Sequence, residues 1–335
     1  MRSISMFFAM LMMSVATATA ADPTPGKVKG GAAYSLPQWF KHSFLDFRDD
    51  IQEARGQGKH VMVFLHFDEC PYCARMLKEN FVGGSSREFI ETNFDVIGVN
   101  VLGSLEVTWI DGATYTERAL AARLEVFATP TIVFLGPDGA KVLQLTGYRD
   151  PPALRYALEY VQSSSYRTQF FTTYLAARDK PAIYAFRKHT QFSNTTNFKG
   201  YKTPLAILFE DRYCAECARF HDNTLNHPDV LAEMKKFLFV RLDAESSRPV
   251  IDLAGKTTTP AQWAKAMDLS YRPAVVLFNE GREIYRVDGR LYHFHFKEAL
   301  RYVSGGYYKR FSVSKYRAAY REDLLKKGID IDYAE

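Results

Sequence analysis

The 335-residue sequence predicts an α/β protein made of two copies of one unit, and three observations support this. In each half, a strand-like run, a Cys-x-x-Cys pair and a helix-like run follow one another. In each half, a proline then opens an apolar strand that ends in a turn, at nearly equal distances after Cys73 and after Cys217. Later matches between the halves, such as Tyr160 with Tyr302, all share one offset. A constant offset over such a long stretch indicates a duplicated unit.

In the first unit, residues 61–67 are rich in β-branched and aromatic residues, which predicts a strand. Residues 74–79 are good helix formers, and 131–135 predict the later strand. An earlier helix is expected to bury one apolar face, formed by Phe44, Phe47, Ile51 and Ala54.

The second unit repeats this order, with strands expected at 205–209 and 274–278 and a helix beginning near 218. A charged helix around 316–327 closes the chain. Segments 109–112 and 252–260 are insertions between the Cys-x-x-Cys helix and the proline.

The first twenty residues are predicted to be a cleaved signal peptide. Arg2 precedes an apolar run at 6–15, and a small-x-small pattern ends at Ala20. Residues 21–33 are expected to form a flexible leader. The predicted domains are 34–178 and 179–335. These features predict an exported protein, with the periplasm as its compartment, that has no later membrane-spanning segment.

The cysteines and the charge limit the classes of function. All four cysteines fall in two Cys-x-x-Cys pairs, whereas structural disulfides of exported proteins usually join distant residues. The pairs lie too far apart for a four-cysteine zinc site, so no metal or other cofactor is expected. A net charge of +5, spread among acidic residues, excludes an extensive surface for nucleic acid.

Each pair is expected to open a helix, and this position suits thiol chemistry. Backbone N–H groups at a helix N-terminus stabilise a thiolate and lower its pKa. Cys70 and Cys214 are therefore predicted to be exposed nucleophiles. Cys73 and Cys217, one helical turn further on, are predicted to be the shielded resolving thiols.

The Cys-Pro-Tyr-Cys pair at 70–73, the Ala-Thr-Pro-Thr segment at 128–131 and the Gly147-Tyr148 close resemble the thioredoxin superfamily. The first unit is most similar to exported thioredoxin-like proteins of the SoxW type, and the second resembles the superfamily more loosely. The resemblance implies two tandem thioredoxin folds, each with a mixed sheet flanked by helices. It also implies that Pro130 and Pro273 are cis and face the disulfides, with Thr129 and Arg272 beside them for substrate binding. An ordinary trans proline remains the alternative at both positions.

The chain departs from the thioredoxin pattern before each motif. The buried acidic residue of thioredoxin is replaced by Phe64 and Leu208, so such a carboxylate is expected to be absent from both halves. His66 is a candidate proton relay or a packed core histidine, and Glu210 is its counterpart in the second unit.

The residues between the cysteines predict two unequal centres. Pro71 and Tyr72 resemble the glutaredoxin pair and suggest an intermediate reduction potential. The Glu216 carboxylate is expected to oppose thiolate formation at Cys214 and to make the second centre more reducing. The alternative is that the second pair is only a structural disulfide.

The sequence thus predicts an exported thiol–disulfide oxidoreductase that acts on protein disulfides or thiols, as a reductase or an isomerase. A membrane thiol–disulfide carrier is its expected redox partner. The alternatives are a disulfide oxidase, or a non-catalytic tandem scaffold with structural disulfides.

Overall fold

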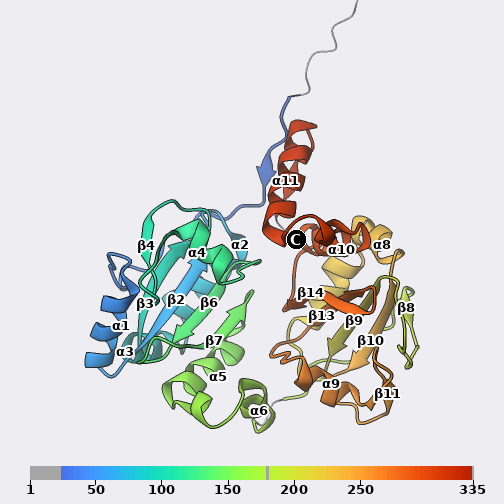
Figure 1. Cartoon of the computed structure of the whole chain (residues 1–335), viewed down its shortest axis with the longest axis horizontal. Coiled ribbons are helices and arrows are strands. Elements are labelled where there is room, and N and C mark those ends of the chain that lie inside the picture. The colour runs from blue at the N-terminus through green and yellow to red at the C-terminus, as the bar shows by residue number, and fades with distance from the viewer. Residues whose placement is uncertain (1–23, 179–180, 334–335) are drawn as a thin grey trace, which may run out of the picture.

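The computed structural model describes residues 24–178 and 181–333. The predicted signal peptide lies outside these residues, as does the start of the predicted second domain at 179, and the proposed boundaries stay predictions. Two α/β units of the same plan lie side by side (Figure 1). Within the described ranges, no helix is long and apolar enough to cross a bilayer.

The first unit has a four-stranded mixed sheet in the order β3-β2-β6-β7. The central strand β2 is parallel to β3 and antiparallel to β6, and β7 is antiparallel to β6. Every residue of β2 is buried, because helices cover both faces of the sheet. The strands are Phe94–Asn100 (β3), His60–His66 (β2), Thr131–Leu135 (β6) and Lys141–Thr146 (β7).

Alternation along β2 divides the core of this unit in two. Met62 and Phe64 pack on one face with α2, η1 and α5, while Val61 and Val63 pack on the other with α1 and α4. The helices are α1 (Phe47–Gly56), α2 (Pro71–Met76), η1 (Leu77–Val82), α3 (Arg87–Asn93), α4 (Glu117–Arg123), α5 (Pro151–Gln162), η2 (Ser165–Arg167) and α6 (Phe171–Ala176).

The apolar face predicted for α1 is confirmed except at its first residue. Phe47, Ile51 and Ala54 are buried, but Phe44 is fully exposed. The helix begins later than expected because Asp46 caps it, its carboxylate accepting the N–H of Arg48.

The second unit repeats the plan with one extra edge strand, in the order β14-β13-β9-β10-β8. Its strands are Arg282–Asp288 (β14), Ala274–Asn279 (β13), Leu205–Glu210 (β9), Leu238–Asp243 (β10) and Phe192–Ser193 (β8). Its helices are α7 (Cys217–Arg219), η3 (Phe220–Leu225), α8 (Pro228–Met234), α9 (Pro260–Ala266), α10 (His293–Ser304), η4 (Tyr307–Lys309) and α11 (Val313–Lys326). The duplication and the predicted fold class are confirmed.

The two insertions are short antiparallel hairpins: β4 (Glu106–Thr108) with β5 (Thr114–Thr116), and β11 (Val250–Ile251) with β12 (Thr257–Thr258). The leader differs from the expectation of a flexible segment. Its residues Val28–Lys29 form β1, which pairs in parallel with β15 (Ile331–Asp332) beyond α11 (Figure 1). The two ends of the described chain therefore meet, a pairing that local sequence patterns do not reveal.

A buried charge cluster joins α10 to α11. Glu298 is fully buried and pairs with Arg317 and Arg321, and its Oε2 lies 3.2 Å from Nδ1 of His295. Burial raises the pKa of Glu298, but the hydrogen bond with His295 and the two arginines outweigh it and bring the pKa to about 2. Burial lowers the pKa of His295 from 6.5 to about 4, despite the nearby carboxylate.

This histidine predicts a loss of stability in mild acid. Between pH 6.5 and 4 the unfolded chain binds a proton at His295 that the folded chain does not bind. The free energy of unfolding should therefore decrease as the pH is lowered from 6.5 to 4, by about 3 kcal/mol in total. Chemical denaturation at several pH values measures this, and His295→Gln should flatten the profile. Exposed His42→Gln serves as the control, and an equal flattening by both variants would contradict the assignment.

Candidate active site

The first disulfide, Cys70–Cys73, lies after β2, within the first turn of α2. Cys70 caps the helix, and its Sγ accepts the backbone N–H of Cys73 at 3.1 Å. The Thr129–Pro130 peptide bond is cis, and Thr129 Oγ1 lies 3.4 Å from Sγ of Cys70. The structure thus brings together four of the predicted site residues. Once the disulfide is reduced, the backbone N–H of Cys73 can stabilise a thiolate at Cys70.

The prediction that Cys70 is exposed is wrong. Only 1% of Cys70 is exposed. Its neighbour Tyr72 packs against Tyr292, with ring centroids 3.8 Å apart, and the Tyr72 hydroxyl accepts the backbone N–H of Tyr292. Burial raises the pKa of Tyr72 well above its ordinary value. The first centre is therefore buried next to a contact between the units that one unit's sequence cannot reveal.

The second disulfide, Cys214–Cys217, follows β9 in the same way. Its helix α7 begins only at Cys217, so Cys214 lies before the helix rather than at its first turn. Arg272–Pro273 is a cis peptide bond that precedes β13, and Nε of Arg272 lies 3.3 Å from Asp211. Cys214 is also less exposed than predicted, at 4%. Both prolines are thus cis, as the resemblance implied.

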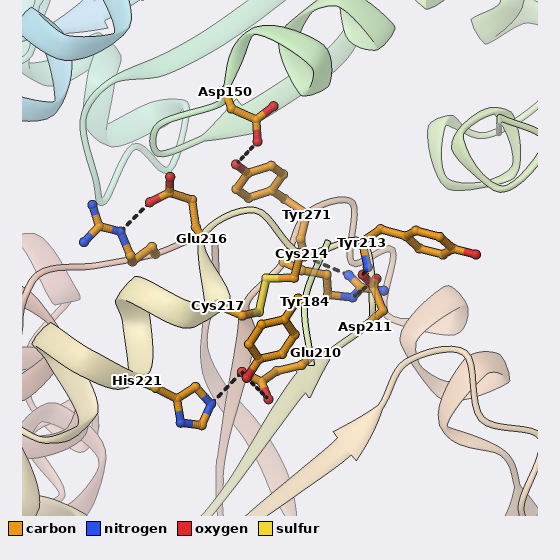
Figure 2. Close-up of a disulfide and its surroundings, with 12 residues drawn as sticks. Asp150, Tyr184, Glu210, Asp211, Tyr213, Cys214, Glu216, Cys217, His221 and Tyr271 are labelled. Atoms are coloured by element: carbon orange, nitrogen blue, oxygen red, sulfur yellow. Dashed lines mark hydrogen bonds and ion pairs between the residues drawn. A yellow bond between two sulfur atoms is a disulfide. The ribbon is translucent and has the colours of Figure 1, made fainter. Parts of the chain in front are cut away.

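The environment of Glu216 differs from the prediction. Its carboxylate is 2.6 Å from Nε of Arg290, 3.2 Å from Arg75 of the first unit and 3.5 Å from Arg219. Figure 2 shows the side chain directed away from the disulfide, toward an arginine. Three guanidinium groups balance this charge, so it has little left with which to oppose a thiolate at Cys214. Glu216 instead links the two units.

Glu216→Gln is therefore expected to lower stability rather than to change thiol reactivity. The variant removes the buried negative charge that Arg290 and Arg75 share, which should cost about 3 kcal/mol of unfolding free energy. Glu91→Gln, at an exposed pair with Arg87, is the matched control and should cost less than about 1 kcal/mol. Urea denaturation of the full chain measures both. Faster alkylation of reduced Cys214 without a loss of stability would contradict this account.

Sequence reasoning missed a buried carboxylate in the second unit. Glu210, the last residue of β9, is fully buried and accepts hydrogen bonds from His221 Nε2 at 2.8 Å and from the Tyr184 hydroxyl at 3.3 Å. All three side chains lie in the surroundings of Cys214–Cys217 (Figure 2). The thioredoxin pattern has its carboxylate at the position of Leu208, so none was expected in this half, but Glu210, the next residue on the same face of the strand, provides one. His66 in the first unit instead bonds to the Tyr34 hydroxyl at 2.8 Å.

A cavity of about 680 Å³ lies beside the second disulfide, between the two units. Cys214, Tyr213 and Arg272 line it from the second unit, while Asp150 and Phe171 line it from the first. No group of three or more His, Cys, Asp or Glu side chains in the described part of the chain is arranged to hold a metal ion. The chemically reactive group that borders the cavity is the second disulfide, through Cys214.

The order of strand, Cys-x-x-Cys, helix and cis proline in each unit agrees with the comparison with known families. The thioredoxin-like domain matches twice, over residues 47–162 and 192–304. The chain belongs to the thioredoxin-like domain family. Both thioredoxin-like domains keep the Cys-x-x-Cys pair near the start of a helix. The predicted closeness to the SoxW type stays a prediction.

Three of the solved structures similar to this chain each correspond to about one domain. A thioredoxin-fold protein from Helicobacter pylori is 17% identical and covers 40% of this chain and 92% of its own, with a TM-score of 0.36. A Thermus thermophilus thioredoxin is 30% identical and covers 35% of this chain and 83% of its own, with a TM-score of 0.28. The C-terminal domain of Neisseria meningitidis DsbD is 19% identical and covers 30% of this chain and 82% of its own, with a TM-score of 0.24. No curated protein matches the chain.

Proposed function

We propose that this protein is an exported thiol–disulfide oxidoreductase that reduces or isomerises disulfides of protein substrates. The observation that carries the proposal is Cys214: it belongs to a Cys-x-x-Cys disulfide and also lines a cavity large enough for a ligand. A structural disulfide needs no such space.

The segment before Pro273 supplies a surface for substrate. Arg272 lines the cavity, and in the described parts of the chain its backbone N–H and C=O make no hydrogen bond. These groups are free to pair with an extended substrate segment in the manner of an added strand. Thr129 is the equivalent residue in the first domain, but Cys70 beside it is buried, which we attribute to the contact between Tyr72 and Tyr292.

The exchange begins from a reduced centre. An external dithiol regenerates this centre after each turnover, and in the cell a membrane thiol carrier supplies the reducing equivalents. The Cys214 thiolate attacks one sulfur of the substrate disulfide, and the first substrate thiolate leaves. The Cys217 thiolate then attacks Sγ of Cys214 and releases the second substrate thiolate. Two electrons pass to the substrate, and Cys214–Cys217 is oxidised. The protons lost by the two protein thiols balance those gained by the two substrate thiolates.

Glu210 and His221 are placed to accept the proton that Cys217 must lose. Their hydrogen bond is buried beside the disulfide, where solvent is excluded (Figure 2). Glu210→Gln keeps the shape but removes the base, so kcat should fall about 100-fold while KM changes little. Its pH profile should also change, which a merely structural role would not cause. Glu233→Gln, at a buried glutamate paired with Lys236, is the control.

Insulin reduction in the presence of dithiothreitol tests the proposed function. The unmodified protein should accelerate insulin precipitation, and a variant with all four cysteines replaced by serine should not. Equal rates for the two proteins would favour the non-catalytic scaffold. Export is tested separately, by the N-terminal sequence of the mature protein, which should begin at Ala21.

A further inference from the structure

The repeat contains two equivalent residues, Asp150 and Tyr292, and each lies near the Cys-x-x-Cys centre of the other domain. Their side chains differ in size, and the two centres differ accordingly. Asp150 caps α5 and Tyr292 caps α10, and the two occupy corresponding positions of the repeat. Tyr292 packs on Tyr72, which lies between Cys70 and Cys73 in the sequence, and belongs to the same apolar core as both cysteines. Asp150 is smaller, and its carboxylate accepts the hydroxyl of Tyr271 at 2.8 Å. The equivalent space at the second centre stays open as the cavity beside Cys214.

We propose that this cavity between the domains is the substrate site of the second centre, and that it takes an extended polypeptide segment whose cysteine has apolar neighbours. This inference rests on the proposed function. It adds that the first domain forms part of the binding site for substrates of Cys214.

The apolar part of the wall comes largely from the first domain and the segment after it. Phe171 and Leu175 of α6 lie there with Tyr156 of α5 and Ile183. Ile183 is more than half exposed, so an apolar side chain of a ligand would remove additional apolar surface from water. The volume of about 680 Å³ is within the range of ordinary ligand sites.

The arginines in the wall already have partners, which argues against a small anionic disulfide as the occupant. Arg149 is almost fully buried, donates to the carbonyls of Thr146 and Tyr148, and pairs with Asp288. Arg272 pairs with Asp211. What remains for a ligand is the apolar wall, the free backbone groups of Arg272 and the exposed Lys265 at the α9 side, a combination that suits a polypeptide.

The test compares two substrates with the same leaving group. One is an extended peptide with a single cysteine between Val and Leu, joined by a disulfide to thionitrobenzoate. The other is mercaptoethanol joined to thionitrobenzoate. The protein is the full chain with Cys70→Ser and Cys73→Ser, reduced with dithiothreitol and then desalted. Cys214 attacks the substrate sulfur and thionitrobenzoate leaves; Cys217 then releases the second thiol, so the reaction needs no further reductant.

Two variants fill the cavity, one from each domain, without removing a native side-chain contact. Ala153→Phe acts from α5 and Ala261→Phe acts from α9. Each should slow release from the peptide about 10-fold and release from the small disulfide less than about twofold, because the ring takes the place of one buried apolar side chain. Ala319→Phe, on the exposed face of α11, is the control and should change neither rate.

The peptide itself provides a second measurement. Replacing its Val and Leu by Asp should lower the second-order rate constant for thionitrobenzoate release about 10-fold. This measurement uses the protein with Cys70→Ser and Cys73→Ser and no cavity variant. Equal slowing of both substrates by the cavity variants, or no slowing of either, would overturn the inference while leaving the oxidoreductase activity in place. If neither substrate releases thionitrobenzoate, the proposed function itself fails, and the inference with it.

Discussion

Replacing Cys214 by serine is expected to lower the rate of insulin reduction by at least about 100-fold, since the attacking thiolate is lost. Replacing Cys70 by serine is expected to change the rate less than about twofold. The difference follows from access, because Cys214 lines the cavity while Cys70 is buried next to Tyr72, which packs against Tyr292. Both variants are compared with the unmodified chain at the same dithiothreitol concentration.

Trapping experiments provide an independent check on the roles of the cysteines. Cys217→Ser should accumulate a mixed disulfide between Cys214 and substrate, because the resolving thiol is absent. Cys73→Ser should accumulate little, although the resemblance to thioredoxins alone would have favoured it. A dominant effect of Cys70→Ser would show that the first centre opens readily in solution, and that the second disulfide is structural.

Tyr292→Ala is expected to expose the first centre. The variant removes an aromatic pair, while a backbone N–H still lies opposite the Tyr72 hydroxyl. Loss of the ring contact and loosening of that hydrogen bond together weaken the closed state by about 2 kcal/mol. Alkylation of Cys70 in the reduced protein should then be about 30-fold faster, since about 1.4 kcal/mol corresponds to a factor of ten.

The matched control is Tyr201→Ala, at a tyrosine that packs within the second domain's own core. It should leave the alkylation of Cys70 unchanged, and neither variant should alter the alkylation of Cys214. Peptide mapping of iodoacetamide-labelled protein separates the four cysteines. An unchanged rate at Cys70 in Tyr292→Ala would mean that the ring does not control access, and the assignment of a closed first centre would have to be abandoned.

Local patterns were sufficient for the fold because they report interactions within one unit. The continuously apolar run of β2 predicts a strand covered on both faces, and the constant offset of the repeat predicts that the second unit copies the first. The same reasoning failed at Phe44, where the cap at Asp46 starts the helix later than the apolar spacing suggests. Capping depends on a single side-chain hydrogen bond, which apolar periodicity does not record.

The sequence by itself determined the two thioredoxin-like domains, the four cysteines and the prolines beside them, because each follows from residues close together in the chain or in register with the repeat. Only the tertiary structure decided which centre borders a cavity, where the charge of Glu216 goes and which carboxylate lies near the second disulfide. Tyr292 and Arg75 reach the opposite domain, and such contacts depend on how two complete surfaces fit together. That fit is a property of packing between domains, and no local pattern in the chain encodes it.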